Sequence, residues 1–380
     1  MTPPLSSDRH VPAEATAAPP AAGPPRTPAA AGAGRRALAP GWFAAVMGTG
    51  ILADSAVTLP RGAEGLRAAA TVVWAVAALL LLVLTAGYVR QRALRGHAAD
   101  PAAAQFLGAP PMALLTVGAG AVLLGGRVMG MRAALAVDWS LWSLGTAGGL
   151  ATAVAVPYLM ITRHRYAPDA ASGGWLMPVV PPLVSAATGA LLIPHAAAGQ
   201  PRLALLLACY ALLGMGSVAV LLVLAMVYSR LVHHEAPAGA AVPTVWIGLG
   251  ALGQAVTGLG ALATASRGVL PAPYAQGAAA LALLPGAGLW GFAVLWLALA
   301  VALTIRELRT GLPFAPTWWS FIFPLGACVT GTSALAARTG SLLFVWTAVF
   351  LYGSLVAAWA VVARHSLVHA AGHRLRRLRG

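Results

Sequence analysis

The sequence predicts an all-α membrane protein with ten transmembrane helices that form five helical hairpins. Two observations carry this prediction: an extreme composition and an internal repeat. Hydrophobic residues make up 59% of the 380 residues and charged residues only 9%, whereas a soluble domain carries about 25% charged residues. The composition therefore excludes a soluble globular protein.

The repeat is a segment that opens on proline and then becomes rich in glycine and hydroxyl residues. It occurs five times, beginning at Pro40, Pro111, Pro182, Pro243 and Pro316. Each of these segments is followed by a smoother apolar stretch that ends in arginine. A repeat at such a period indicates that one structural unit is arrayed. The unit here is a pair of helices, so five units give ten helices.

The individual spans follow from length, because about 20 apolar residues cross a hydrocarbon core of roughly 30 Å. The predicted spans are residues 40–58, 66–89, 106–126, 139–161, 175–194, 203–228, 243–264, 278–304, 317–337 and 341–363. They lie in a transmembrane domain over 39–365. Residues 1–38, rich in alanine and proline, predict a disordered cytoplasmic tail. Residues 366–380 predict a basic cytoplasmic tail.

Orientation follows from arginine, which is the only strongly basic residue type in this lysine-free chain. With the N-terminus inside, seventeen arginines lie on the inner side of the predicted spans and seven on the outer side. This bias predicts that both termini lie in the cytoplasm. We expect the protein to lie in the plasma membrane. The net charge of +15 is explained by a basic rim beside anionic membrane lipids, and no nucleic-acid partner is needed.

The first helix of each predicted hairpin is small and mildly polar, while the second is bulky and faces lipid. Two interpretations of the first helices remain open. Their glycines could serve close helix packing alone, or the five helices could surround a lumen lined by glycines and hydroxyls. The candidate lumen residues are Gly48, Thr49, Gly50, Thr116, Gly118, Ser185, Thr188, Gly248, Thr257, Gly326 and Thr330.

Charge favours anions in such a lumen. All five of these helices start on the cytoplasmic side, so five positive dipole ends would meet at one mouth beside the arginine rim. The predicted spans carry almost no ionisable group. A pore without fixed charge passes an anion without trapping it.

One carboxylate, Asp54, falls inside a predicted span, near its outer end. It could be a solvated or hydrogen-bonded boundary residue, or it could couple transport to protons, because acids inside membranes are functional candidates. The other polar groups do not converge. The histidines lie in predicted loops and tails and there is no lysine, so we predict no metal site, no cofactor and no enzymatic activity.

Two phrases carry a family resemblance. Pro40-Gly41-Trp42-Phe43 with Met47-Gly48-Thr49-Gly50, together with Trp318-Trp319-Ser320-Phe321-Ile322-Phe323-Pro324, resemble the tellurite-resistance/dicarboxylate transporter family. That family includes bacterial tellurite-resistance proteins, fungal malate carriers, fungal sulfite efflux pumps and plant slow anion channels. The resemblance covers the chain after residue 38.

The resemblance implies five hairpins arranged with quasi-fivefold symmetry around a central pore, and a homotrimer with one pore in each protomer. It also implies a gate, since a phenylalanine of the ninth span blocks the pore in that family. The matching residue is Phe323, directly before the kinking Pro324, and Phe321 is the fallback.

Three functions follow as hypotheses. The first is a gated channel or channel-like exporter for small inorganic or organic anions. The second is a proton-coupled carrier of C4-dicarboxylates such as malate, and a sulfite exporter lies between the two. A membrane enzyme or a receptor is disfavoured, because the spans hold no convergent catalytic groups and the sequence has no soluble sensory domain.

Overall fold

The computed structural model describes residues 38–92 and 94–379, with side chains as far as residue 371. The predicted N-terminal tail lies outside the described residues, apart from Leu38. Over the described residues the chain is helical and contains no strand. This confirms the predicted all-α class.

The principal helices fall into two sets that alternate along the chain. The first set, which we call the buried helices, is α1 (Phe43–Ala56), α5 (Ala109–Gly120), α8 (Pro181–Leu192), α10 (Trp246–Ser266) and α12 (Ile322–Thr339). The second set, the outer helices, is α2 (Ala63–Gln91), α7 (Met131–Thr162), α9 (Gln200–His233), α11 (Ala272–Thr310) and α13 (Leu342–Arg379).

Short elements connect the two sets. They are α3 (Leu94–Ala99), α4 (Pro101–Gln105) and α6 (Gly126–Met129), the π-helical segment Ala121–Gly125, and 3₁₀ turns at Pro40–Trp42, Phe106–Gly108, Gly173–Leu176, Ile193–His195, Gly239–Val245 and Pro316–Phe321. Most of the 3₁₀ turns precede a buried helix. Proline in the first turn of a helix is tolerated, since its missing N–H would have no helical partner there.

Eight helical stretches in the described part of the chain are long and apolar enough to cross a membrane. Neither α1 nor α8 reaches that length, because α1 has 14 residues and α8 has 12. In both cases the predicted span runs into a tighter turn next to the helix: Pro40–Trp42 before α1, and Ile193–His195 after α8, in which the span ends. Eight of the ten predicted spans therefore correspond to helical stretches that are long and apolar enough to cross a membrane.

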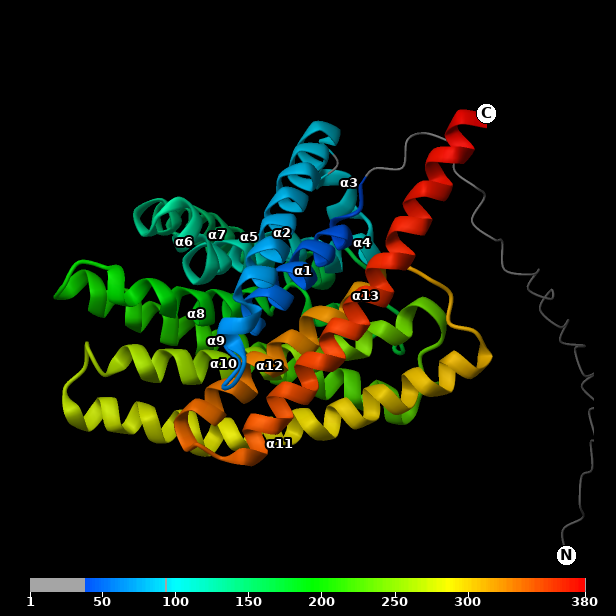
Figure 1. The fold of residues 1–380 in the computed structure, drawn as a ribbon. Coiled ribbons are helices and arrows are strands. Elements are labelled where there is room, and N and C mark those ends of the chain that lie inside the picture. Colours follow the sequence, from blue (N-terminus) through cyan, green and yellow to red (C-terminus); the bar gives the residue numbers. More distant parts are fainter. Residues whose placement is uncertain (1–37, 93, 380) are drawn as a thin grey trace, which may run out of the picture. The chain divides into compact units, whose positions relative to one another are not determined.

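The helix contacts follow the order of the chain. Each buried helix packs against the outer helix that follows it: α1 on α2, α5 on α7, α8 on α9, α10 on α11 and α12 on α13. The buried helices also contact one another in a closed series, α1 to α5, α5 to α8, α8 to α10, α10 to α12 and α12 back to α1. Figure 1 shows α1, α10 and α12 between α2 and α11.

Tryptophans of the outer helices donate hydrogen bonds to the buried ones. Trp74 of α2 donates to the carbonyl of Val117 on α5 at 3.0 Å, and Trp142 of α7 donates to that of Ser185 on α8 at 2.9 Å. Trp359 of α13 donates to Thr49 Oγ1 on α1 at 3.1 Å. A buried indole N–H needs such an acceptor, so these bonds fix α2, α7 and α13 in rotation and height against the buried helices.

Glycine allows the buried helices to approach at backbone distance. At Gly253 of α10, a Cβ atom would lie 2.6 Å from the carbonyl carbon of Ala327 and 2.7 Å from the backbone nitrogen of Cys328 on α12. At Gly50 of α1, a Cβ atom would lie 2.7 Å from Thr116 Cγ2 on α5. In lipid there is no hydrophobic driving force between helices, so van der Waals packing at small residues stabilises their association.

Two predicted boundaries change. The helix of the fourth predicted span begins at Met131 instead of 139, after Gly130 turns the chain with a φ of +84°. The basic segment predicted over 366–380 continues α13 as helix to Arg379. The earlier start of α7 places Asp138 inside a membrane-spanning helix, which the sequence prediction missed.

The α10–α12 contact generates a stability prediction. Gly253→Ala should lower the free energy of unfolding by about 1–3 kcal/mol, because the added methyl meets the α12 backbone, which cannot move aside. Thermal unfolding of the purified protein in detergent measures this.

Gly288→Ala on the exposed side of α11 is the matched control, because no atom lies within 4 Å of its Cβ position. That substitution should be neutral or stabilise by about 0.4–1 kcal/mol. Equal stability of the two variants would contradict the backbone contact at Gly253.

Candidate functional site

Two cavities lie at opposite ends of the buried helices. The N-end cavity, of about 320 Å³, is lined at the helix starts by Met47, Met112, Val180, Ile247 and Phe323 among others. The C-end cavity, of about 360 Å³, is lined nearer the helix ends by Ile51, Ala119, Ala187, Gln254 and Thr330 among others. Since all five buried helices give their early residues to one cavity and their late residues to the other, they run parallel.

The two cavities share no lining residue and are separated by a short closed section. On α1, Met47 lines the N-end cavity and Ile51 the C-end cavity. These positions are one helical turn apart, or about 6 Å along the axis. On α10 the corresponding residues are Ala251 and Gln254. A thin layer of side chains therefore closes the route between the cavities.

The two gate candidates occupy different surroundings. Phe323 lines the N-end cavity with 6% of its surface exposed, and Pro324 lines it as well. Phe321 lines neither cavity. Its ring packs edge-to-face on Trp246, with centroids 5.2 Å apart. Only Phe323 is thus placed where rotation of its ring would change the width of a cavity.

Three of the predicted lumen residues come together in the C-end cavity: Thr188, Thr257 and Thr330. The hydroxyls of Thr257 and Thr330 lie 2.8 Å apart, and each also bonds a backbone carbonyl of its own helix. This pair joins α10 to α12 at the cavity wall.

The remaining predicted lumen residues line neither cavity and lie at helix contacts. Within this group, Gly248 faces Leu224 and Trp296 of the outer helices, and Gly326 faces Ile51. The group is Gly48, Thr49, Gly50, Thr116, Gly118, Ser185, Gly248 and Gly326. The glycines of this group lie against atoms of neighbouring helices, as the packing interpretation expects.

Charge is distributed unequally between the two cavities. Among the described residues that line the N-end cavity, none is charged. The C-end cavity is lined by Asp54, Arg267 and Arg338. The arginines lie at the C-terminal ends of α10 and α12, where cations also offset the negative end of the helix dipole.

Arg338 is anchored but not neutralised. Its Nη2 donates to the carbonyl of Gly260 at 3.0 Å and to Thr264 Oγ1 at 3.5 Å, while its Nη1 has no hydrogen-bond partner. Over the described part of the chain, ion pairs form only around Glu64, so neither Arg338 nor Arg267 pairs with a carboxylate there.

Asp54 is more buried than its position near a span end suggested, with 5% of its surface exposed. Its Oδ1 has no hydrogen-bond partner and lies 2.8 Å from the Cβ position of Gly120 on α5. Any larger residue at 120 would displace it. Asp54 also lines the C-end cavity.

Asp138 of α7 is a second buried carboxylate, with 0% exposure and no hydrogen-bond partner at either oxygen. It lies behind α5, where its Oδ1 is 2.6 Å from the Cβ position of Gly118, and it lines neither cavity. Asp138 stands one residue before the predicted span 139–161, so the sequence prediction placed it outside the membrane, whereas it lies within α7.

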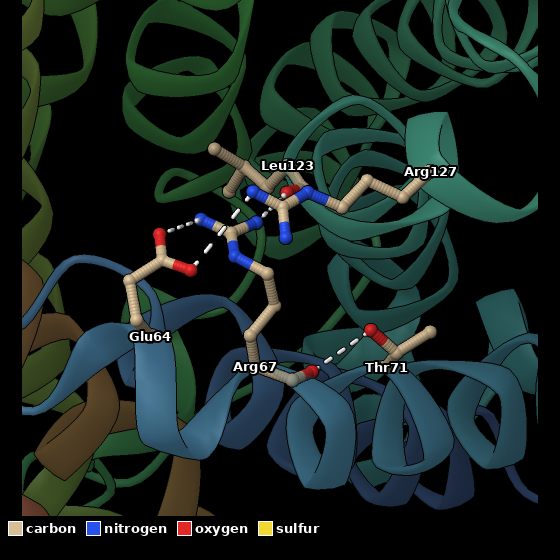
Figure 2. Close-up of polar contacts among 5 residues, drawn as sticks. All are labelled: Glu64, Arg67, Thr71, Leu123 and Arg127. Atoms are coloured by element: carbon tan, nitrogen blue, oxygen red, sulfur yellow. Dashed lines mark hydrogen bonds and ion pairs between the residues drawn. The ribbon is translucent and has the colours of Figure 1, made fainter.

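The rim of the C-end cavity is held by an arginine network, drawn in Figure 2. Arg67 of α2 donates from Nη1 to the carbonyl of Leu123 at 3.0 Å, and Leu123 lines the cavity. Glu64 lies 3.6 Å from Arg67 Nη2 and 3.9 Å from Arg127 Nη2. Leu123 belongs to the π-helical segment after α5. The hydrogen bond from Arg67 therefore ties this segment to α2.

Among the described residues, the other potential metal ligands and nucleophiles do not form a cluster. Within the described residues, no group of three or more His, Cys, Asp or Glu side chains could hold a metal ion. Cys209 and Cys328 are both buried and unpaired as disulfides.

Comparison with known proteins gives one family and several relatives. The family model for SLAC1, described as a voltage-dependent anion channel, matches residues 37–367. The sulfite efflux pump SSU1 of Arthroderma otae is 29% identical over 339 residues, covering 85% of this chain and 88% of its own. An uncharacterised transporter of Methanocaldococcus jannaschii is 28% identical over 332 residues, covering 85% of this chain and 90% of its own.

Proposed function

The chain belongs to the SLAC1 family of voltage-dependent anion channels, and on this premise we propose that small anions cross it along a path joining the N-end and C-end cavities. It is a multi-pass membrane protein that transports anions. One observation supports the path most directly: two cavities at opposite ends of the same five helices approach within about one helical turn.

The proposed architecture is ten membrane-crossing segments in five hairpins with quasi-fivefold symmetry. The contacts between consecutive helices and the closed series of contacts among the buried helices support it. The short helices α1 and α8 would cross together with their flanking 3₁₀ turns. Ten segments return the chain to its starting side, which agrees with cytoplasmic placement of both termini in the plasma membrane.

Phe323 is the proposed gate, and Pro324 lies directly after it in the first turn of α12. Proline is tolerated at this position, so the kink expected at Pro324 is not part of the proposed gate. The ring lines an uncharged cavity, and an apolar constriction of this kind can stop ions by excluding water. Beyond it, the hydroxyls of Thr188, Thr257 and Thr330 would meet the anion in the C-end cavity.

The substrate we propose is a small oxyanion, and sulfite is the first to test. The named relatives that support this include sulfite efflux pumps of Arthroderma otae and Trichophyton rubrum. A homotrimer in the lipid bilayer is proposed from the family resemblance, and the mass of the purified protein in nanodiscs would test it.

Phe323→Ala should raise anion conductance about tenfold or more, equivalent to a barrier lowered by about 1.4 kcal/mol. The physical reason is that a methyl group cannot fill the closed section that the ring borders. The measurement is anion current through the purified protein in a planar bilayer.

Phe321→Ala is the matched control, because that ring packs on Trp246 and lines neither cavity. It should leave conductance near the wild-type value. If Phe321→Ala raised the conductance and Phe323→Ala left it unchanged, the gate would be Phe321. If neither variant changed the conductance, the proposal of an aromatic gate would be wrong.

A second candidate function is a proton-coupled carrier of C4-dicarboxylates, in which Asp54 would carry the proton. The observation that favours it is a buried carboxylate without a hydrogen-bond partner that reaches the C-end cavity.

Asp54→Asn distinguishes the two functions. For a passive path, a pH gradient across proteoliposomes should not drive accumulation of the best-transported anion, in the wild type or in Asp54→Asn. Accumulation that the gradient drives in the wild type and that Asp54→Asn abolishes would instead establish the carrier.

A further inference from the structure

The threonines that line the C-end cavity have already used their hydroxyl protons. A hydroxyl has one hydrogen to donate, and each of these Oγ1 atoms donates to a backbone carbonyl three or four residues earlier, at 2.8–3.0 Å. The threonines are Thr58, Thr188, Thr257, Thr264 and Thr330. Their oxygens shape the wall of the cavity, but they can donate to an anion only by giving up a bond to their own segment.

Gln254 of α10 lines the same cavity and differs from these threonines. Its side chain has 4% of its surface exposed and makes no hydrogen bond among the described residues. Ser333 Oγ and Arg338 Nη1 also lack partners, but both atoms are buried in the cavity wall. The amide atoms of Gln254 are not buried in that way, so they face the space of the cavity with their donors uncommitted.

Gln254 stands at the inner end of the C-end cavity, beside the closed section. Ala251, three residues earlier on α10, lines the N-end cavity, about 4.5 Å away along the helix axis. The guanidinium of Arg338 bonds α10 at Gly260, six residues after Gln254 and about 9 Å further from the closed section. An anion that enters the closed section therefore has the Gln254 amide beside it, while this cation stays nearer the rim.

We propose that Gln254 is a specificity-determining residue whose amide replaces part of the water around an anion at the closed section. This inference rests on the proposed transport path and adds to it the residue that discriminates among anions. A narrow section removes water from an ion, and groups of the protein must take the place of that water. A carboxamide offers two N–H donors and no net charge, so it stabilises an anion without trapping it. Anions that hold water tightly then depend on Gln254 more than anions that shed it easily.

The test compares chloride with thiocyanate, two monoanions whose charge is constant over the working pH range. Chloride holds its water more tightly, so its passage depends more on the amide. Gln254→Met keeps a similar side-chain length and removes the donors. Its chloride conductance in planar bilayers should fall about tenfold, the effect of losing one hydrogen bond to a charged group, and its thiocyanate conductance should fall less. The permeability ratio of thiocyanate to chloride, measured from reversal potentials, should therefore rise.

Two further variants separate the amide from general effects on the cavity. Gln254→Asn keeps an amide on a shorter side chain, so its ratio should lie between those of the wild type and Gln254→Met. Thr58→Val removes a hydroxyl that lines the same cavity but donates to the carbonyl of Ser55. Its conductance and ratio should stay near the wild-type values. A reversal potential reports only the molecules that conduct, so the ratio does not depend on how much of a variant is folded.

The outcomes distinguish this inference from the function on which it rests. An unchanged ratio in Gln254→Met, whether the currents persist or fall equally, overturns the role of Gln254 while anion transport stands. The same conclusion follows if Thr58→Val shifts the ratio as much as Gln254→Met does. If Gln254→Met carries no current, the ratio of Gln254→Asn decides, and an unchanged value overturns the inference. A wild type that conducts neither anion contradicts the proposed path as well.

Discussion

The structure depends on the close approach of helix backbones at glycine. At Gly253 the α10 backbone touches the α12 backbone, and at Gly50 and Gly326 a glycine on one buried helix accommodates a side chain from the next. In a membrane, lipid tails are as apolar as leucine, so helices associate through such contacts and through polar bonds. The middle of the buried group is closed by this packing, and cavities remain towards the two ends of the helices.

The outer helices α2, α7 and α13 are coupled to this group by tryptophans. Trp74 and Trp142 each donate to a backbone carbonyl on a buried helix, and Trp359 donates to a threonine hydroxyl. The same helices expose large apolar side chains such as Leu82 and Phe350, with 69% and 72% of their surface accessible. One face of these helices therefore meets lipid, while a polar atom on the other face bonds the buried partner and helps fix its position.

Charge lies away from the closed section. The N-end cavity has an uncharged lining within the described residues, whereas the C-end cavity holds Arg267, Arg338 and Asp54. A narrow section without fixed charge does not trap an ion, and selection can then occur in the wider, wetter cavity beside it. The N-terminal ends of the five parallel helices supply a diffuse positive field at the N-end cavity. The sequence analysis predicted arginines beside these helix ends, but no arginine lines this cavity among the described residues.

The sequence by itself determined the all-α membrane class and the alternation of buried and lipid-facing helices, because composition and the proline repeat report burial directly. The sequence also predicted Phe323, through the resemblance, and Asp54, as an acid inside a span, as site residues, and each lines a cavity. Only the tertiary structure decided which glycines and hydroxyls face a cavity: Thr257 and Thr330 do, whereas Gly118 and Gly248 face neighbouring helices. It also revealed that Asp138 is buried and that Asp54 and Arg338 line the same cavity. The physical reason is that nearly every residue of these small helices is buried, so their sequence has no periodic difference between faces, and the direction of each side chain is set by which helix packs beside it.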